Sequence, residues 1–258
     1  MENLNIDNKY INNEKQGVIK ENTKFDEKDT EEQEIKKKLN DLLSKIECFD
    51  PSNWAKIHDK LNSGMIGTCL TSKDCYRIGF IKFLIDKARE SNIHFAKDGN
   101  HFYVYNNQYW IKISEDLLKS FLHMAAQKMG IPIGLSSCVK FIKSTYEQLI
   151  ESGFFEKMIQ DNVTHLNVLN GTIKIDLDGV NLRDFDSKHF LTHQLDFEYD
   201  KNRVNQVWLD FLNKVLPDKD TQKTLQQAIG YLFIKDLKLE KVIFLYGIGS
   251  NGKSVIFE

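Results

Sequence analysis

The feature that most constrains this chain is a short apolar run followed directly by a glycine-rich loop. The run is VIFLY at residues 242–246, and the loop GIGSNGKS occupies residues 247–254. A wholly apolar run of this length is typical of a strand buried on both faces of a parallel sheet. The loop matches the pattern G-x-x-x-x-G-K-[ST], in which backbone N–H groups surround phosphate oxygens. The sequence therefore predicts a strand followed by a phosphate-binding loop that leads into a helix.

The residue types of the loop have separate physical roles. Glycines adopt backbone torsions that other residues avoid, which lets the loop wrap around a phosphate group. Lys253 is expected to reach the β- and γ-phosphates of ATP, and the Ser254 hydroxyl is expected to bind Mg²⁺. The alternative is a plain glycine-rich turn, but such a turn has no need of Lys-Ser at its end. The predicted nucleotide-binding residues are Gly247, Gly249, Ser250, Asn251, Gly252, Lys253 and Ser254.

Only a short segment follows this loop. Four residues come after Ser254, which is fewer than a stable helix requires. A phosphate-loop domain also needs several parallel strands and a second acidic motif that holds Mg²⁺. We therefore expect residues 241–258 to be the first strand and loop of an incomplete α/β nucleotide-binding domain. We assign no catalytic residue within the chain and expect no ATP turnover from it alone.

The overall composition allows a folded core but provides no general attraction for nucleic acid. The chain has 258 residues, of which 41% are hydrophobic, and its formal net charge is -2. Such a charge creates no long-range field for a polyanion, so a DNA contact has to come from a local basic patch. The N-terminus is polar, and no apolar run is long enough to span a membrane. We expect a cytoplasmic protein with reduced cysteines and no membrane partner.

The first hundred residues divide into a polar tail and a helical region. Residues 1–30 are rich in Asn, Lys, Glu and Asp and contain few large apolar side chains, so we expect disorder. Apolar residues recur at steps of three and four over residues 35–46, which predicts a helix with one buried face. Further helices are expected at residues 53–61 and 72–90. Residues 31–95 are thus predicted to be mostly helical.

Residues 96–240 are expected to form an accessory domain of the α+β class with short hairpins. Strand patterns flank polar turns at residues 106–108 and at Asn170-Gly171, and both predict β-hairpins. The predicted elements are strands 102–105 and 109–113, helices 114–130 and 136–152, strands 166–169, 172–175 and 180–183, an extended segment 190–199, and helices 204–215 and 221–233. Asp220 is the predicted N-cap of the last helix.

Two further groups of side chains have the chemistry of a DNA contact. An aromatic hairpin could stack single-stranded bases, although packing against the next helix explains such residues better. Its members are Tyr103, Tyr105, Tyr109 and Trp110. Lys140 and Lys143 lie on a helix that follows another after a short break, as in a winged-helix DNA reader. For these lysines a solvated helix face is the favoured interpretation.

Possible metal ligands have simpler explanations. Asp176 and Asp178 have the spacing of a carboxylate pair, but the adjoining Gly179 indicates a surface turn. His165 and His193 have no metal-binding partners nearby in the sequence, so structural histidines are expected.

The loop resembles a known family. Its G-x-G-x-N-G-K-S form is similar to that of superfamily 3 helicases, above all the phage/plasmid primase-helicase family that includes the poxvirus primase-helicase. The preceding AIGYL at residues 228–232 resembles the helix that these proteins carry before their loop. LNGTI at 169–173, FLT at 190–192 and the Tyr199-Asp200 pair resemble the accessory domain. The resemblance covers residues 100–258.

This resemblance implies a DNA replication protein of a phage, prophage or plasmid. The intact protein would be an ATP-dependent DNA helicase that forms a hexameric ring of identical subunits around single-stranded or forked DNA. ATP and Mg²⁺ would bind at residues 247–254. The family's second carboxylate motif, polar sensor and arginine finger would fall beyond Glu258.

Two other functions are compatible with the sequence. The chain could be a non-enzymatic module that binds DNA or directs oligomerisation. It could also belong to an unrelated phosphate-loop kinase, but the long N-terminal region and Asn251 disfavour that reading.

Overall fold

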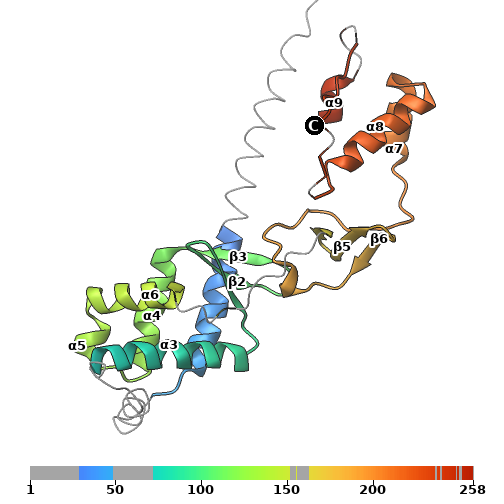
Figure 1. Ribbon diagram of the computed structural model, residues 1–258. Coiled ribbons are helices and arrows are strands. Elements are labelled where there is room, and N and C mark those ends of the chain that lie inside the picture. The colour runs from blue at the N-terminus through green and yellow to red at the C-terminus, as the bar shows by residue number, and fades with distance from the viewer. Residues whose placement is uncertain are drawn as a thin grey trace, which may run out of the picture. The chain divides into compact units, whose positions relative to one another are not determined.

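The computed structural model describes residues 29–48, 72–151, 155, 163–235, 237–238, 240–247, 249 and 252–257 (Figure 1). The chain divides into two compact units, Met1–Met158 and Ile159–Glu258. The helix predicted at residues 53–61 and the tail of residues 1–28 lie outside the described residues. None of the described helices combines the length and apolar character that crossing a membrane requires.

The first unit packs helices against a small antiparallel sheet. Its elements in chain order are a helix at residues 29–45, α3 (Ser72–Glu90), β1 (Phe95–Asp98), β2 (His101–Tyr105), β3 (Trp110–Ile113), α4 (Glu115–Lys128), α5 (Ile133–Ser136) and α6 (Val139–Glu151). The strands form a meander of order β1-β2-β3. The hairpin predicted around residues 106–108 is confirmed, because Tyr105 pairs with Trp110 across it.

The helices of this unit begin and pack as their sequence patterns indicate. The first helix buries Ile35, Leu39 and Leu42, which confirms the predicted helical face. Ser114 caps α4, since its side chain accepts a hydrogen bond from the backbone N–H of Leu117. Ile35, Leu39 and Leu42 belong to one hydrophobic core together with residues of α3, the sheet, α4 and α6.

The second unit contains a second meander followed by helices. Its elements are β4 (Thr164–Val168), β5 (Gly171–Asp176), β6 (Gly179–Arg183), the 3₁₀ turn η1 (Ser187–His189), α7 (Gln206–Val215), α8 (Lys219–Tyr231) and α9 (Lys253–Phe257). The sheet has the order β4-β5-β6. The predicted Asn170-Gly171 hairpin is confirmed. A Cβ at Gly171, where φ is +149°, would lie 2.4 Å from the carbonyl oxygen of Arg183, so only glycine fits there.

The segment predicted to be extended at residues 190–199 runs along β4 without forming a strand. It makes one parallel bridge, between Leu195 and Val168. The backbone N–H of Leu195 donates to the carbonyl oxygen of Asn167, and that of Leu169 donates to the carbonyl oxygen of Phe197. The segment thereby covers the edge of β4, which protects that edge from pairing with another chain.

Two predictions about the second unit are wrong. The N-cap of α8 is Asp218 rather than Asp220, because the Asp218 carboxylate accepts from the N–H of Thr221 at 2.8 Å. Residues 242–246 are not a strand, and Phe244 is 84% exposed. An all-apolar strand is typical of a parallel sheet covered on both faces, and the described residues contain antiparallel sheets alone. The mixed α+β class is therefore confirmed for the described residues, which form no α/β nucleotide domain.

Candidate functional site

The glycine-rich loop closes on itself through its lysine. The ammonium group of Lys253 donates to the carbonyl oxygen of Gly247 at 3.0 Å, which joins the last turn of the loop to its first residue. Two glycines have positive φ angles, +28° at Gly249 and +78° at Gly252. Helix α9 begins at Lys253, as the loop-to-helix pattern predicted. Ser250 and Asn251 lie outside the described residues, so the structure places five of the seven predicted nucleotide-binding residues.

Helix α7 packs against the glycine-rich loop at Gly252. A Cβ at Gly252 would lie 2.9 Å from two ring carbons of Phe211 and 3.1 Å from a methyl group of Val215. The loop backbone therefore reaches its position only because residue 252 has no side chain. Neither contact was apparent from the sequence, where Phe211 and Val215 are merely apolar positions of an amphipathic helix.

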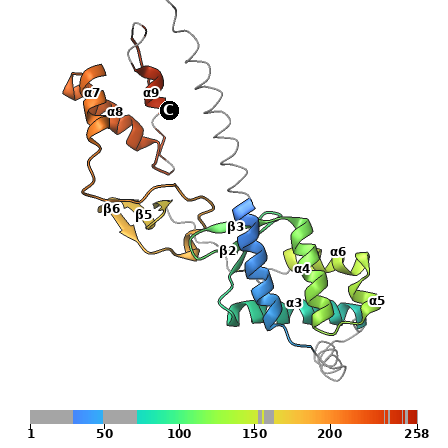
Figure 2. The ribbon, with the colours of Figure 1, turned by 180° about the vertical axis from the view of Figure 1, so that it is seen from behind.

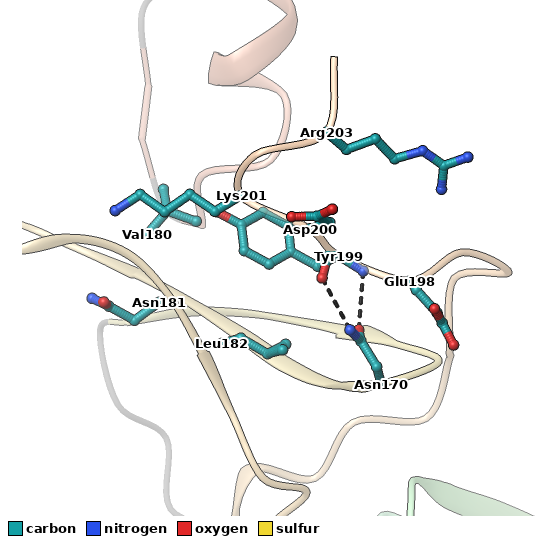
Figure 3. A pocket seen from close by; sticks show the side chains of 9 residues that line it. All are labelled: Asn170, Val180, Asn181, Leu182, Glu198, Tyr199, Asp200, Lys201 and Arg203. Atoms are coloured by element: carbon teal, nitrogen blue, oxygen red, sulfur yellow. Dashed lines mark hydrogen bonds between the residues drawn. The ribbon is translucent and has the colours of Figure 1, made fainter. Parts of the chain in front are cut away.

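A cavity of about 710 Å³ lies between β6 and the segment that follows η1 (Figure 3). It is lined by Asn170, Val180, Asn181, Leu182, Glu198, Tyr199, Asp200, Lys201 and Arg203. Figure 3 shows the Tyr199 ring lying above Leu182, with the Lys201 side chain extending over Val180. The lining contains two cations and two carboxylates, so the cavity has no strong preference for an anion or a cation.

One hydrogen-bonded pair fixes the shape of this cavity. The side chain of Asn170 donates to the carbonyl oxygen of Tyr199 at 2.9 Å and accepts from its backbone N–H at 3.0 Å. These two bonds, drawn as dashed lines in Figure 3, attach the segment to the β4–β5 turn. The Asp200 carboxylate accepts from the backbone N–H of Asn202 at 2.9 Å, which makes it a turn residue.

The aspartates of the β5–β6 turn have a structural role. Asp176 pairs with Lys174 at 2.6 Å and accepts from the backbone N–H of Asp178 at 3.0 Å. The hydrogen bond from Lys174 is the main reason why the pKa of Asp176 is lowered, and backbone N–H groups add to the effect. This geometry favours the predicted surface turn. Among the residues that the structure describes, no group of three or more His, Cys, Asp or Glu side chains could hold a metal ion.

The aromatic side chains of the hairpin are largely buried. Tyr103, Tyr105 and Trp110 are buried, and Tyr109 is half-buried. Trp110 packs against Tyr105 with ring centroids 5.3 Å apart. Tyr109 packs against the hydrophobic core that includes α4, so core packing, the favoured interpretation, is confirmed for that residue, whereas Tyr103, Tyr105 and Trp110 are buried outside this core. Tyr103, Tyr105 and Trp110 are therefore too buried to stack on DNA bases.

The predicted histidines do not share an environment. His165 of β4 stacks on His189 of η1, with centroids 3.8 Å apart and planes inclined by 23°, while His193 is exposed. This pair could not be predicted from the sequence, because His189 belongs to a 3₁₀ turn that no periodicity indicates. Lys140 and Lys143 are both exposed on α6, as predicted.

Comparison with known proteins identifies a family for the middle part of the chain. The family described as D5 N terminal like matches residues 82–217, more than half of the chain. The match begins inside α3 and ends just after α7, ahead of α8 and the glycine-rich loop. No curated protein matches the chain. The chain therefore belongs to the D5 N-terminal-like family, the N-terminal domain of D5-like primase-helicases.

Proposed function

We propose that this protein acts in DNA replication of a phage, prophage or plasmid as an ATP-dependent helicase of the superfamily 3 primase-helicase type. The observation that carries the proposal is the order of two features along the chain. A D5 N-terminal-like region at residues 82–217 is followed by a G-x-x-x-x-G-K-[ST] loop at residues 247–254. D5-like primase-helicases share the first feature, and the second has the chemistry of nucleotide binding.

The loop residues have complementary roles in nucleotide binding. Gly249 and Gly252 have positive φ angles, a backbone conformation found in loops whose N–H groups bind phosphate oxygens. Lys253 exchanges its contact with the Gly247 carbonyl for the β- and γ-phosphates of ATP. The Ser254 hydroxyl is a hard oxygen ligand of the kind that Mg²⁺ prefers. When bound, the ion neutralises charge on the β- and γ-phosphates.

The working protein would be a hexameric ring of identical subunits around single-stranded or forked DNA. In such an assembly ATP hydrolysis depends on positioning and charge neutralisation around the γ-phosphate. The loop of this chain would supply the phosphate-binding part of that site. The competing proposal, a non-enzymatic DNA-binding or oligomerisation module, needs no nucleotide.

Nucleotide binding separates these two proposals. Fluorescence of N-methylanthraniloyl-ATP is titrated with the 258-residue chain in the presence and absence of Mg²⁺. We expect Mg²⁺-dependent binding that weakens about ten- to hundred-fold in Lys253→Ala, since a hydrogen bond from a charged group contributes about 1.5–3 kcal/mol. Lys241→Ala, at an exposed lysine before the loop, is the matched control and should bind like the parent chain. Equal affinities in the two variants would contradict the nucleotide-binding role of the loop.

A further inference from the structure

Cationic side chains from two helices gather at one end of the first unit. Helices α3 and α6 meet where Arg77 donates from Nη1 to the Ser144 hydroxyl at 3.4 Å. Lys73 lies about one turn before Arg77 on α3, and Lys140 lies about one turn before Ser144 on α6. Figures 1 and 2 show the start of α3 beside α5 and α6. We call the surface formed by Lys73, Arg77, Lys140 and Lys143 the α3–α6 surface.

This surface has an excess of positive charge. Lys73, Lys140 and Lys143 are exposed, and none of them makes an ion pair with a described carboxylate. Arg77 is paired with Asp74 at 2.7 Å. Residues 129–146 contain no Asp or Glu. The next carboxylate on α6 is Glu147, one turn beyond Lys143, so positive charge dominates the first turns of the helix.

The thiol of Cys138 lies within range of two of these lysines. Hydrogen bonds from the backbone of Phe141 and then Lys140 hold the pKa of Cys138 below its usual value. The charges of Lys73 and Lys140 lower it further, despite the opposing effect of burial. Lys73 of α3 and Lys140 of α6 therefore both act on this thiol. A negative charge is stabilised there.

The side chains of the α3–α6 surface distinguish between single-stranded and duplex DNA as ligands. Unpaired bases require aromatic side chains on which to stack. On α6, Phe141 is buried and Tyr146 is half-buried, with the Lys119 ammonium 5.1 Å from its ring centroid. The surface therefore offers side-chain cations without an exposed ring on α6. Such a surface suits the phosphates of a duplex, whose regular spacing allows several cations to bind at once.

The helical arrangement is compatible with a duplex. Helix α6 follows α4 after the short α5, and α4 and α6 are in contact. In helix-turn-helix proteins the N-terminal residues of the second long helix enter the major groove. The first two residues of α6 are Val139, which is 81% exposed, and Lys140. They are the residues that an approaching duplex would meet.

We propose that the α3–α6 surface binds the phosphate backbone of duplex DNA, with Lys140 and Lys143 as its principal contacts. The choice of DNA as the partner rests on the proposed function. The charge, exposure and geometry rest on the first unit alone, and the glycine-rich loop belongs to the second unit. The two proposals can therefore fail independently.

Fluorescence anisotropy tests the proposal with the full 258-residue chain, a labelled duplex and one of its single strands over a salt series. We expect Lys140→Gln/Lys143→Gln to weaken duplex binding roughly five- to ten-fold at low salt and to reduce the log–log salt slope by about 1.8. Lys37→Gln/Lys82→Gln is the control. It removes two exposed lysines that make no ion pair with a described carboxylate, one on the first helix and one on the far half of α3.

Three outcomes would overturn the proposal. They are unchanged duplex affinity in the Lys140/Lys143 variant, an equal loss in the control variant, and tighter binding of the single strand than of the duplex. Both variants change exposed residues, and matching circular dichroism melts confirm that they fold. Lys253→Ala should keep its duplex affinity. If the parent chain bound the duplex but no ATP, the proposed function would be contradicted and this inference would stand.

Discussion

Asn170 and Tyr199 are joined by two hydrogen bonds, one in each direction between the asparagine side chain and the tyrosine backbone. A side-chain amide can bond in both directions because it carries an N–H donor and a carbonyl acceptor side by side. The pair connects positions 29 residues apart in the sequence, and it fixes the segment after η1 against the β4–β5 turn.

We predict that Asn170→Ala destabilises the second unit by about 1 kcal/mol, because two exposed hydrogen bonds are lost and water replaces part of each. Asn181→Ala is the matched control. Asn181 lines the same cavity, but its side chain makes no hydrogen bond with a described residue. Urea unfolding monitored by tryptophan fluorescence measures the difference. A control variant that loses as much stability as Asn170→Ala would show that the two bonds contribute nothing.

The folded first unit extends ahead of the region that matches the family. Leu42 is fully buried in the helix at residues 29–45, and it belongs to the same hydrophobic core as residues of α4 and the sheet. Further bonds attach this helix to its neighbours. Asn106 donates to Glu34 at 3.0 Å, and Lys128 donates to the carbonyl oxygen of Leu43 at 2.7 Å. A fragment that begins at residue 82 would therefore lack part of its core.

We predict that Leu42→Ala lowers the free energy of unfolding by about 3 kcal/mol, the usual cost of a buried Leu-to-Ala change that leaves a cavity. Ile133→Ala should change it by less than about 0.5 kcal/mol, since Ile133 is 75% exposed. Chemical unfolding of both variants tests this. A loss in Leu42→Ala as small as the one expected for Ile133→Ala would show that the helix at residues 29–45 is not part of the cooperative unit.

Asp218 makes the start of α8 sensitive to acid. Its pKa is lowered below the ordinary 3.8, first by the hydrogen bond from the Thr221 hydroxyl and then by the backbone N–H of Thr221. A carboxyl with a lowered folded-state pKa stabilises the fold at pH values above its unfolded pKa. That contribution is lost as the pH falls through the lower, folded-state pKa.

We predict that the melting temperature of the parent chain decreases more steeply below about pH 4 than that of Asp218→Asn, which cannot titrate. Asp220→Asn is the control, because Asp220 lies in the same first turn without being the cap. Thermal melts at several pH values measure the effect. Identical pH profiles for the parent and Asp218→Asn would contradict it.

Local signals predicted much of this fold, and long-range contacts account for what they missed. The Asn170-Gly171 turn was predictable because a tight hairpin needs a residue that tolerates positive φ. Strand β1 was missed because FAKD has little strand propensity, and it forms by pairing with β2. Asp218 and Asp220 are two residues apart and equally suited to cap a helix, so the sequence could not decide between them.

In the predicted site, too, local signals were predictable from the sequence and long-range contacts were not. The loop pattern located Lys253 and Gly252 correctly as the turn into a helix. It gave no information on Phe211, which lies 41 residues earlier and contacts Gly252 only in the folded unit. The apolar run at 242–246 predicted a buried strand, but hydrophobicity indicates only that a segment is stabilised by burial against other elements. It does not supply the neighbouring strands.

The contact between Gly252 and Phe211 leads to the last prediction. In Gly252→Ala the new Cβ would meet the Phe211 ring at 2.9 Å, and the φ of +78° would add backbone strain. We expect the loop to shift and ATP affinity to fall at least as much as in Lys253→Ala. Gly249→Ala separates the two causes, because Gly249 also has positive φ but its Cβ would meet no atom within 4 Å.

Replacing the ring as well, in Phe211→Leu/Gly252→Ala, should recover part of the lost affinity, since residues in contact have non-additive effects. Fluorescence titration with N-methylanthraniloyl-ATP measures all four variants. If Phe211→Leu/Gly252→Ala binds no better than Gly252→Ala alone, the support of the loop by α7 is not what makes glycine necessary at position 252.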